Sequence, residues 1–329
     1  VVRRIRNERS FYGFRFADAT VQFPDFDNQE MDVTVLLDTL QSEAPALTRQ
    51  QQEIISKGNS FAFDFFSEVC RREAEAEVFL SPFSMEAALS MLCNGAGGST
   101  YSQIASVLGF EGLGKAEIDA AYRALLSALL SADNTTTLSL ANALWLNRGF
   151  PANPTFASTL TDNYNATVEN LDFSSQKALD TVNGWASKNT QGMIPTLFDR
   201  LEPDWIYILA NAICFKGIWA TQFNTDNTYR EDFHCLSGEV RKTDFMHGEI
   251  PCGYAYDEKL GAALCELPFG NKAFMLDILL PDAGIDFTGF VEGLNADNWN
   301  ALVADIRYSE KFVIIPKMDV AFSGTDSIT

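Results

Sequence analysis

Two histidines, His234 and His247, are the side chains of this sequence best suited to transfer protons near neutral pH. Neither belongs to an HExxH motif, and no GxSxG motif occurs, so neither a zinc-peptidase nor an esterase type of site is indicated. A Ser-His-Asp or Cys-His site stays open, because the members of such a site lie far apart in the chain. No spacing typical of metal ligands stands out. The sequence therefore predicts no catalytic, cofactor-binding or metal-binding residues, and no enzyme.

One segment partly matches a phosphate-binding loop. Residues 109–116, GFEGLGKA, follow the Gly-x4-Gly-Lys pattern but end in Ala116, which lacks the hydroxyl that would hold Mg²⁺. The segment also follows a predicted helix, whereas a phosphate-binding loop follows a buried strand. We interpret it as the end of one helix and a linker to the next.

Six cysteines occur, and none of them forms a CxxC pair. Cys93, Cys214 and Cys265 lie within apolar runs, and free cysteine is among the most buried residue types. We expect these thiols to be small apolar groups of a core. A disulfide framework would be typical of a much smaller secreted chain.

The composition limits the classes of function. The 329 residues are 47% hydrophobic, which indicates a folded chain with enough apolar side chains for one large or two ordinary domains. No uncharged apolar run of about eighteen residues occurs, so no membrane span is predicted. The net charge of −20 would repel a polyanion, which argues against nucleic acid as a partner.

The elements that must position any site follow from hydrophobic periodicity. The predicted helices cover residues 48–72, 84–95, 100–108, 115–131, 154–165, 176–190 and 286–305. Ser84 is expected to be the N-cap of the second helix, and Thr100 and Gln103 to form a capping box at the third. Predicted strands or extended runs cover residues 77–83, 138–146, 168–171, 205–217, 229–235, 239–247, 252–257, 311–322 and a hairpin at 262–281. This order predicts an α+β fold.

The first 47 residues have a different composition. Five arginines occur before residue 16, no further Lys or Arg follows until Arg49, and an acidic stretch, FPDFDNQEMD, lies between. We predict that residues 1–47 are a tail or linker outside the fold and that residues 48–329 form one domain. The chain begins at Val1, and a missing start is equally compatible with this pattern.

Four segments closely resemble the serpin family. Residues 78–110 (VFLSPFSMEAALSMLCNGAGGSTYSQIASVLGF) are similar to its strand, central helix and following helix, and LANALWLN (140–147) is similar to the second strand of its main sheet. VNGWASKNTQGMI (182–194) resembles the helix across that sheet, and ILANAICFKGIWATQFN (208–224) resembles the third strand. The resemblance implies the serpin fold: helices around a large, mainly antiparallel central sheet, with further sheets.

The resemblance also implies a function. A serpin inhibits a serine or cysteine protease when its reactive loop is cut while attached to the enzyme and then inserts into the central sheet. The alternative is a non-inhibitory serpin that acts as a chaperone, a carrier or a store. The family further implies a monomer that is secreted or in the cell envelope, although a cytoplasmic location stays open. It implies a protease as partner and no cofactor.

Site residues follow from the same resemblance. Ser81, Ser84 and Asn211 correspond to the polar cluster beneath the centre of the sheet, and Lys216, Gly217 and Trp219 correspond to the top of that sheet. Packing positions near the second sheet are Phe223, Thr228, Phe233 and Met246. Two departures stand out: Glu77 replaces a common asparagine, and the chain ends at SGTDSIT, before the expected position of the last main-sheet strand and the reactive loop. We therefore expect a C-terminally truncated serpin.

Overall fold

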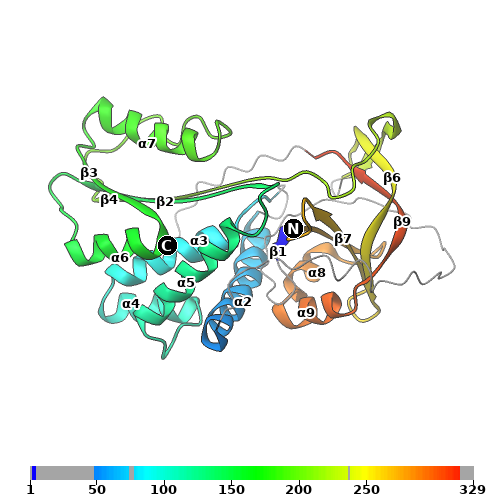
Figure 1. Ribbon diagram of the computed structural model, residues 1–329, viewed down its shortest axis with the longest axis horizontal. Helices are drawn as coiled ribbons and strands as arrows, with labels where there is room; N and C mark the ends of the chain where they lie inside the picture. Colours follow the sequence, from blue (N-terminus) through cyan, green and yellow to red (C-terminus); the bar gives the residue numbers. More distant parts are fainter. Residues whose placement is uncertain (1, 5–47, 74–77, 236–237, 319–329) are drawn as a thin grey trace. The chain divides into compact units, whose positions relative to one another are not determined.

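The computed structural model describes residues 2–4, 48–73, 78–235 and 238–318, and these residues divide into two units (Figure 1). We call residues 48–61 and 83–217 the helical unit. The described residues among 2–4, 62–82 and 218–318 form the sheet unit. Helix α2 (Arg49–Arg72) contributes its first part to the helical unit and its second part to the sheet unit. Within the described residues, none of the helices is long and apolar enough to cross a bilayer.

The helical unit combines helices with one small sheet. Its other elements are α3 (Pro82–Gly95, of which Pro82 belongs to the sheet unit), α4 (Gly98–Val107), α5 (Lys115–Leu130), β2 (Thr137–Asn147), α6 (Pro154–Tyr164), β3 (Ala166–Leu171), α7 (Gln176–Asn189) and β4 (Tyr207–Lys216). The strand order is β3-β2-β4. β2 and β3 run parallel because α6 connects them, whereas β2 and β4 are antiparallel.

The sheet of the helical unit is covered on both faces, as Figure 1 shows. The strand predicted at 138–146 is confirmed as β2, and its residues 140–145 are all buried, as expected for a strand covered on both faces. On one face, α7 packs against β2 and β4. Its Val182 shares an apolar cluster with Ala143 and Trp145 of β2 and Ile208 of β4. α5 and α6 lie against β2 and β3 on the other face. The helix predicted to cross the sheet is therefore confirmed as α7.

Local signals explain where the helices begin. Thr48 and Gln51 exchange hydrogen bonds between side chain and backbone, so Thr48 caps α2 at the predicted start of this helix. The prediction for Ser84 was wrong, because α3 begins at Pro82, whose fixed φ suits the first turn. The capping box at Thr100 was also wrong, since α4 begins at Gly98 with Gly97 as its N-cap.

The sheet unit is built mainly from strands. Its elements are β1 (Val2–Arg4), η1 (Thr225–Asn227), β5 (Thr228–His234), β6 (Val240–Asp257), β7 (Ala262–Phe269), β8 (Phe274–Pro281), α8 (Phe287–Gly293), α9 (Ala296–Ala304) and β9 (Arg307–Pro316). The strand order is β1-β8-β7-β6-β5, and β9 pairs with the middle of β6. Antiparallel pairing joins all of these strands.

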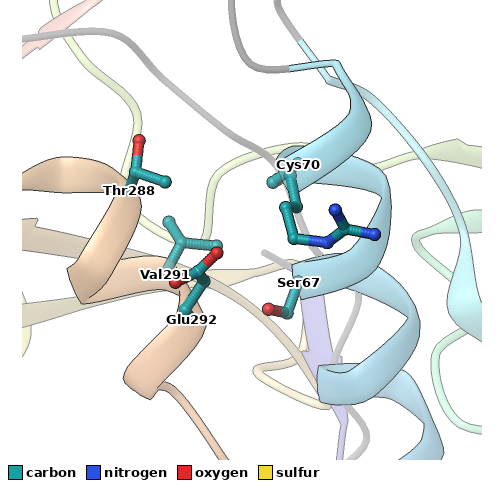
Figure 2. Close-up of a pocket in the computed structure, with 6 residues that line it drawn as sticks. Ser67, Cys70, Thr288, Val291 and Glu292 are labelled. Carbon is teal, nitrogen blue, oxygen red and sulfur yellow. The ribbon is translucent and has the colours of Figure 1, made fainter.

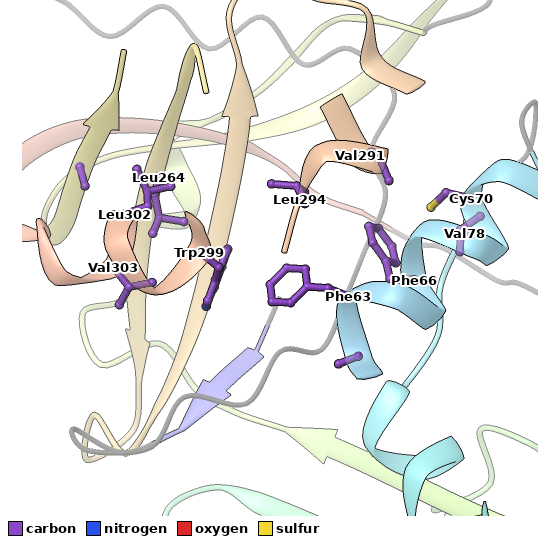
Figure 3. Packing of buried hydrophobic residues seen from close by; sticks show 12 residues of the cluster. Phe63, Phe66, Cys70, Val78, Leu264, Val291, Leu294, Trp299, Leu302 and Val303 are labelled. Atoms are coloured by element: carbon purple, nitrogen blue, oxygen red, sulfur yellow. The ribbon is translucent and has the colours of Figure 1, made fainter. Parts of the chain in front are cut away.

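The core of the sheet unit is formed by the second part of α2, the sheet, and helices α8 and α9 (Figure 3). Phe63 and Phe66 of α2 point toward α8 and α9, and Trp299 of α9 approaches the ring of Phe63 with centroids 5.9 Å apart. Leu264 of β7 is fully buried in the same cluster. Aromatic side chains from α2 thus fill the space between the sheet and its helices.

Some predicted boundaries differ from the structure. The helix expected at 286–305 is two helices, because Asn295 caps α9 and ends the periodic run. The strands expected at 239–247 and 252–257 are the single strand β6. Residues 78–81 hold only one bridge residue, Phe79, where a strand was expected.

The α+β class is confirmed, with two points that differ from the expectation. The sheet with β2 and β4, which resembles the family's main sheet, has three strands within the described residues, and the six-stranded sheet is the larger one. Val2–Arg4 pair with β8, so these three residues are part of a sheet rather than outside the fold. For residues 5–47, which lie outside the described residues, the tail or linker stays a prediction.

Candidate functional site: the β2–β4 strand pair

Two asparagines face each other at the centre of the three-stranded sheet. Asn142 of β2 is the register partner of Asn211 of β4. The Nδ2 atom of Asn211 donates to Oδ1 of Asn142 at 2.7 Å, and Nδ2 of Asn142 donates to the backbone carbonyl of Tyr164 at 2.7 Å. Tyr164 is the last residue of α6, where a helix leaves its carbonyls without intrahelical partners. Asn142 therefore joins the strand pair to the end of a helix.

The polar contacts continue into the helices. The hydroxyl of Tyr164 donates to Oδ1 of Asp119 at 2.8 Å, and Nδ2 of Asn94 donates to the same oxygen at 2.7 Å. Asn142, Tyr164 and Asp119 are all buried. Burial and the neighbouring carboxylate of Asp119 raise the pKa of Tyr164 above its usual value, so Tyr164 stays a neutral donor. Buried groups of this kind fix one arrangement of strands and helices, because any other arrangement leaves them unpaired.

One atom of this chain of contacts lacks a partner within the described residues. The Oδ1 atom of Asn211 is buried and accepts no hydrogen bond there. A buried acceptor without a donor costs free energy, so an asparagine in the middle of this largely apolar strand is a candidate for a functional role.

Strand β4 is an edge strand of this sheet among the described residues. Within the part of the chain that the structure describes, β4 pairs with β2 alone, over its whole length from Tyr207 to Lys216. Half of the backbone N–H and C=O groups of such an edge strand point away from the sheet and can pair with another extended segment. Asn211 lies in the middle of this edge strand.

The predicted residues at the top of the sheet divide between the two units. Lys216 is exposed at the end of β4, opposite Thr137 of β2, and Gly217 is half-buried directly after it. Trp219 belongs to the sheet unit, where its ring stacks on that of Phe269 with centroids 4.6 Å apart. Trp219 is therefore a packing residue of the sheet unit in this structure.

The residues predicted to pack near the second sheet lie around β5 and β6. Phe223 meets Trp219 edge-on at 5.9 Å. Its ring also lies so close to Gly248 that a Cβ there would be 3.0 Å from it. Thr228 and Met246 are register partners, and Phe233 is half-buried on β5 opposite Arg241.

The remaining predicted cluster residues flank the start of α3. Ser81 directly precedes the helix and Ser84 lies within its first turn, where its side-chain oxygen is buried. Ser81 belongs to the sheet unit and Asn211 to the helical unit, so a direct contact between these two members of the predicted cluster stays a prediction. Glu77 lies outside the described residues.

Sequence reasoning missed Asn142, Tyr164, Asp119 and Asn94. One signal was present for the first of these, because Asn142 interrupts the apolar run LANALW as Asn211 interrupts its own strand. Only the strand register shows that the two asparagines are opposite each other.

The groups considered for other chemistry have structural partners. His247 lies between the rings of Tyr229 and Phe312, and its Nε2 is 2.7 Å from Oε1 of Glu231. Nζ of Lys115 donates to the carbonyls of Asn94 and Ala96, so it is not poised for a phosphate. Within the described ranges, no group of three or more His, Cys, Asp and Glu side chains could hold a metal ion.

A depression lies between α2 and α8 of the sheet unit (Figure 2). Val291 and Glu292 of α8 face Ser67 and Cys70 of α2 across it. It is too narrow to hold a water molecule, so it offers no binding volume for a small ligand.

Comparison with known proteins places these observations in a family. The family model described as Serpin (serine protease inhibitor) matches residues 56–325. Iripin-1 of Ixodes ricinus is 31% identical over 253 residues, which cover 75% of this chain and 64% of the relative. The leukocyte elastase inhibitor of Bos taurus is 30% identical over 235 residues, covering 70% of this chain and 62% of that protein.

Solved structures share the fold. The crystal structure of reactive-loop-cleaved human thyroxine-binding globulin matches with a TM-score of 0.76 at 23% identity, covering 82% of this chain and 80% of that one. The chain spans between 62% and 64% of the length of the first three relatives.

Proposed function

The chain belongs to the serpin family, and on this premise we propose that the protein is a serpin-type inhibitor of serine or cysteine proteases. The protease would attack the scissile carbonyl of a reactive loop with its serine oxygen or cysteine sulfur. The peptide bond to the leaving amine would break, the amine would take the proton of the nucleophile, and the loop would remain bound to the enzyme as an ester or thioester. Insertion of the cut loop as a strand would then trap this acyl-enzyme.

The observation that carries the proposal is the position of β4 as an edge strand, which pairs with β2 alone within the described residues. An inserted strand would pair with the outward backbone groups of residues 207–214 and bury alternate side chains. It would also bring donors near the buried Oδ1 of Asn211, which has no partner within the described residues. The order of the elements supports the same site, because α7 lies across the face of this strand pair.

The test uses the complete protein, including any sequence that its gene encodes after Thr329. It is incubated with a panel of serine and cysteine proteases of varied specificity. We expect a covalent complex that survives boiling in detergent, and a sharp rise in melting temperature after the loop is cut. A protease whose nucleophile is replaced by alanine should give no complex.

A loop that is cut without a stable complex and without a rise in melting temperature would overturn this proposal. That outcome would favour the non-inhibitory alternative, in which the protein is a chaperone, a carrier or a store.

The role of Asn211 in sheet opening is part of the proposal. Asn211→Leu should raise the rate of spontaneous loop insertion or polymerisation, because the hydrogen bond to Asn142 fixes the position of β4, the strand beside which the loop would insert. Asn134→Leu, at an exposed position in the turn before β2, is the matched control and should leave both rates unchanged. An equal effect of the two variants would remove Asn211 from the mechanism.

A further inference from the structure

A carboxyl group is buried among the helices of the helical unit. Glu86 of α3 is only 8% exposed. Its carboxylate lies against α2 at Gly58, so close that a Cβ atom added to Gly58 would collide with both carboxylate oxygens of Glu86. Glycine lowers the stability of a helix interior relative to alanine, and Gly58 lies well inside the 24-residue helix α2. The close approach of Glu86 explains why a residue without a side chain stands there.

The polar neighbour of this carboxyl is uncharged. The hydroxyl of Tyr122 on α5 lies near Glu86 and also near Ser90 of α3. Tyr122 itself packs between the rings of Phe83 and Tyr164. These neighbours can support a neutral carboxyl group but do not neutralise a negative charge.

The charged groups of the neighbouring elements are engaged elsewhere. Lys57, which adjoins Gly58 on α2, lies with its methylene chain beside Gly109, and its positive charge helps to lower the pKa of Glu111. On α5, Lys115 binds backbone carbonyls and Asp119 binds Tyr164 and Asn94. Within the described residues, no cation is paired with Glu86.

The protonation of Glu86 therefore depends on whether the group is packed or exposed. Burial raises the pKa of Glu86 from 4.5 to about 7, and the hydroxyl of Tyr122 offsets only a part of this effect. The sign follows from linkage: the packed state binds the proton more tightly than the open state. The stability of the packed state is complete below pH 4.5, declines as the pH rises from 4.5 to 7, and stays at its reduced level above that range.

We propose that the protonation state of Glu86 controls how tightly α2 packs against α3 and α5, so that the helical unit holds a pH-sensitive contact. The neutral group closes the contact at Gly58, and the charged group opens it to water. This inference does not depend on whether the protein inhibits a protease. A pKa difference of this size corresponds to a change in the opening constant on the order of 100-fold between pH 4.5 and 8.

Amide hydrogen exchange on the chain 1–329 tests the proposal. The opening constants of amides 54–61 of α2, corrected for intrinsic exchange, are compared at pH 4.5 and 8 in the wild type, Glu86→Gln and Glu53→Gln. Glu53 is exposed on the same helix and is the matched control. We expect a rise on the order of 100-fold in the wild type and the control, and less than about threefold in Glu86→Gln, which cannot ionise. A rise in Glu86→Gln equal to that of the wild type would overturn the proposal.

A direct titration keeps the proposal testable if Glu86→Gln folds poorly. The side-chain carboxyl of Glu86 is followed by ¹³C NMR in the wild-type chain, and its signal is assigned by its absence from Glu86→Asp, which keeps a shorter carboxyl. We expect a titration midpoint near 7 for this signal. A midpoint near 4.5 would show a solvated carboxyl and would overturn the proposal.

Discussion

Replacement of Asn142 by leucine should destabilise the helical unit more than the same replacement of Asn211. Leucine has nearly the same shape as asparagine but neither donates nor accepts a hydrogen bond. Asn142→Leu leaves two groups without their partners, the Nδ2 of Asn211 and the carbonyl of Tyr164. Asn211→Leu leaves only the Oδ1 of Asn142, and it also removes the buried Oδ1 of Asn211 that has no partner among the described residues.

The magnitudes follow from the cost of an unpaired buried polar group, about 1–3 kcal/mol each. Asn142→Leu should therefore lower the free energy of unfolding by about 2–6 kcal/mol. Asn211→Leu should cost roughly 1–2 kcal/mol, because the removal of its own unpaired atom offsets a part of the loss. In the double variant only the carbonyl of Tyr164 loses its partner, because both side chains that share the hydrogen bond are gone, so its cost should be about 1–3 kcal/mol and below that of Asn142→Leu alone.

Urea denaturation followed by far-UV circular dichroism measures these differences, with the slope of the transition checked for each variant. Asn134→Leu, at an exposed position in the turn before β2, is the control and should change the stability by less than about 0.5 kcal/mol. Equal costs of Asn211→Leu and Asn142→Leu, or additive effects of the two, would contradict the assigned hydrogen bonds.

Three further predictions concern packing and accessibility. Gly58→Ala should destabilise the wild type by about 1–3 kcal/mol, because the new methyl group collides with Glu86. In a Glu86→Ala background the same change should stabilise the protein by about 1 kcal/mol. A double-mutant cycle measured by urea denaturation would contradict this if the sign were the same in both backgrounds. Trp219→Ala should cost about 2–4 kcal/mol because it removes the stack on Phe269, and a midpoint in urea unchanged from the wild type would exclude that contact from the folded state. Cys235 is the only cysteine that is not buried, so it should react first with a thiol reagent under native conditions; a second thiol modified at the same rate, identified by mass spectrometry, would contradict the described burial.

Helices and strands with strong periodicity were predictable from the sequence. The apolar run that forms β2 and the amphipathic pattern of α2 determine their own conformation, because each buries side chains at its own period. The buried state of Cys93, Cys214 and Cys265 was confirmed for the same reason. The predicted start of a helix was wrong where a local backbone preference sets it. Pro82, for example, begins α3 two residues before the expected cap.

The candidate site shows the limit of sequence reasoning most clearly. Asn211 could be singled out because a polar residue in an apolar strand must find partners, and the family resemblance indicated the same position. Its partner Asn142 is 69 residues away in the sequence, and only the antiparallel register of β2 and β4 places the two side chains together.

The same limit applies to Glu86 and Gly58. Most of the elements, the family and the polar residue in β4 could be predicted from the sequence, since these depend on periodicity and on motifs that are continuous in the chain. The folded structure was needed to show which carboxyl is buried against which glycine and which amides share a hydrogen bond. Such contacts depend on the packing of distant segments, and neither composition nor spacing along the chain encodes that packing in a readable form.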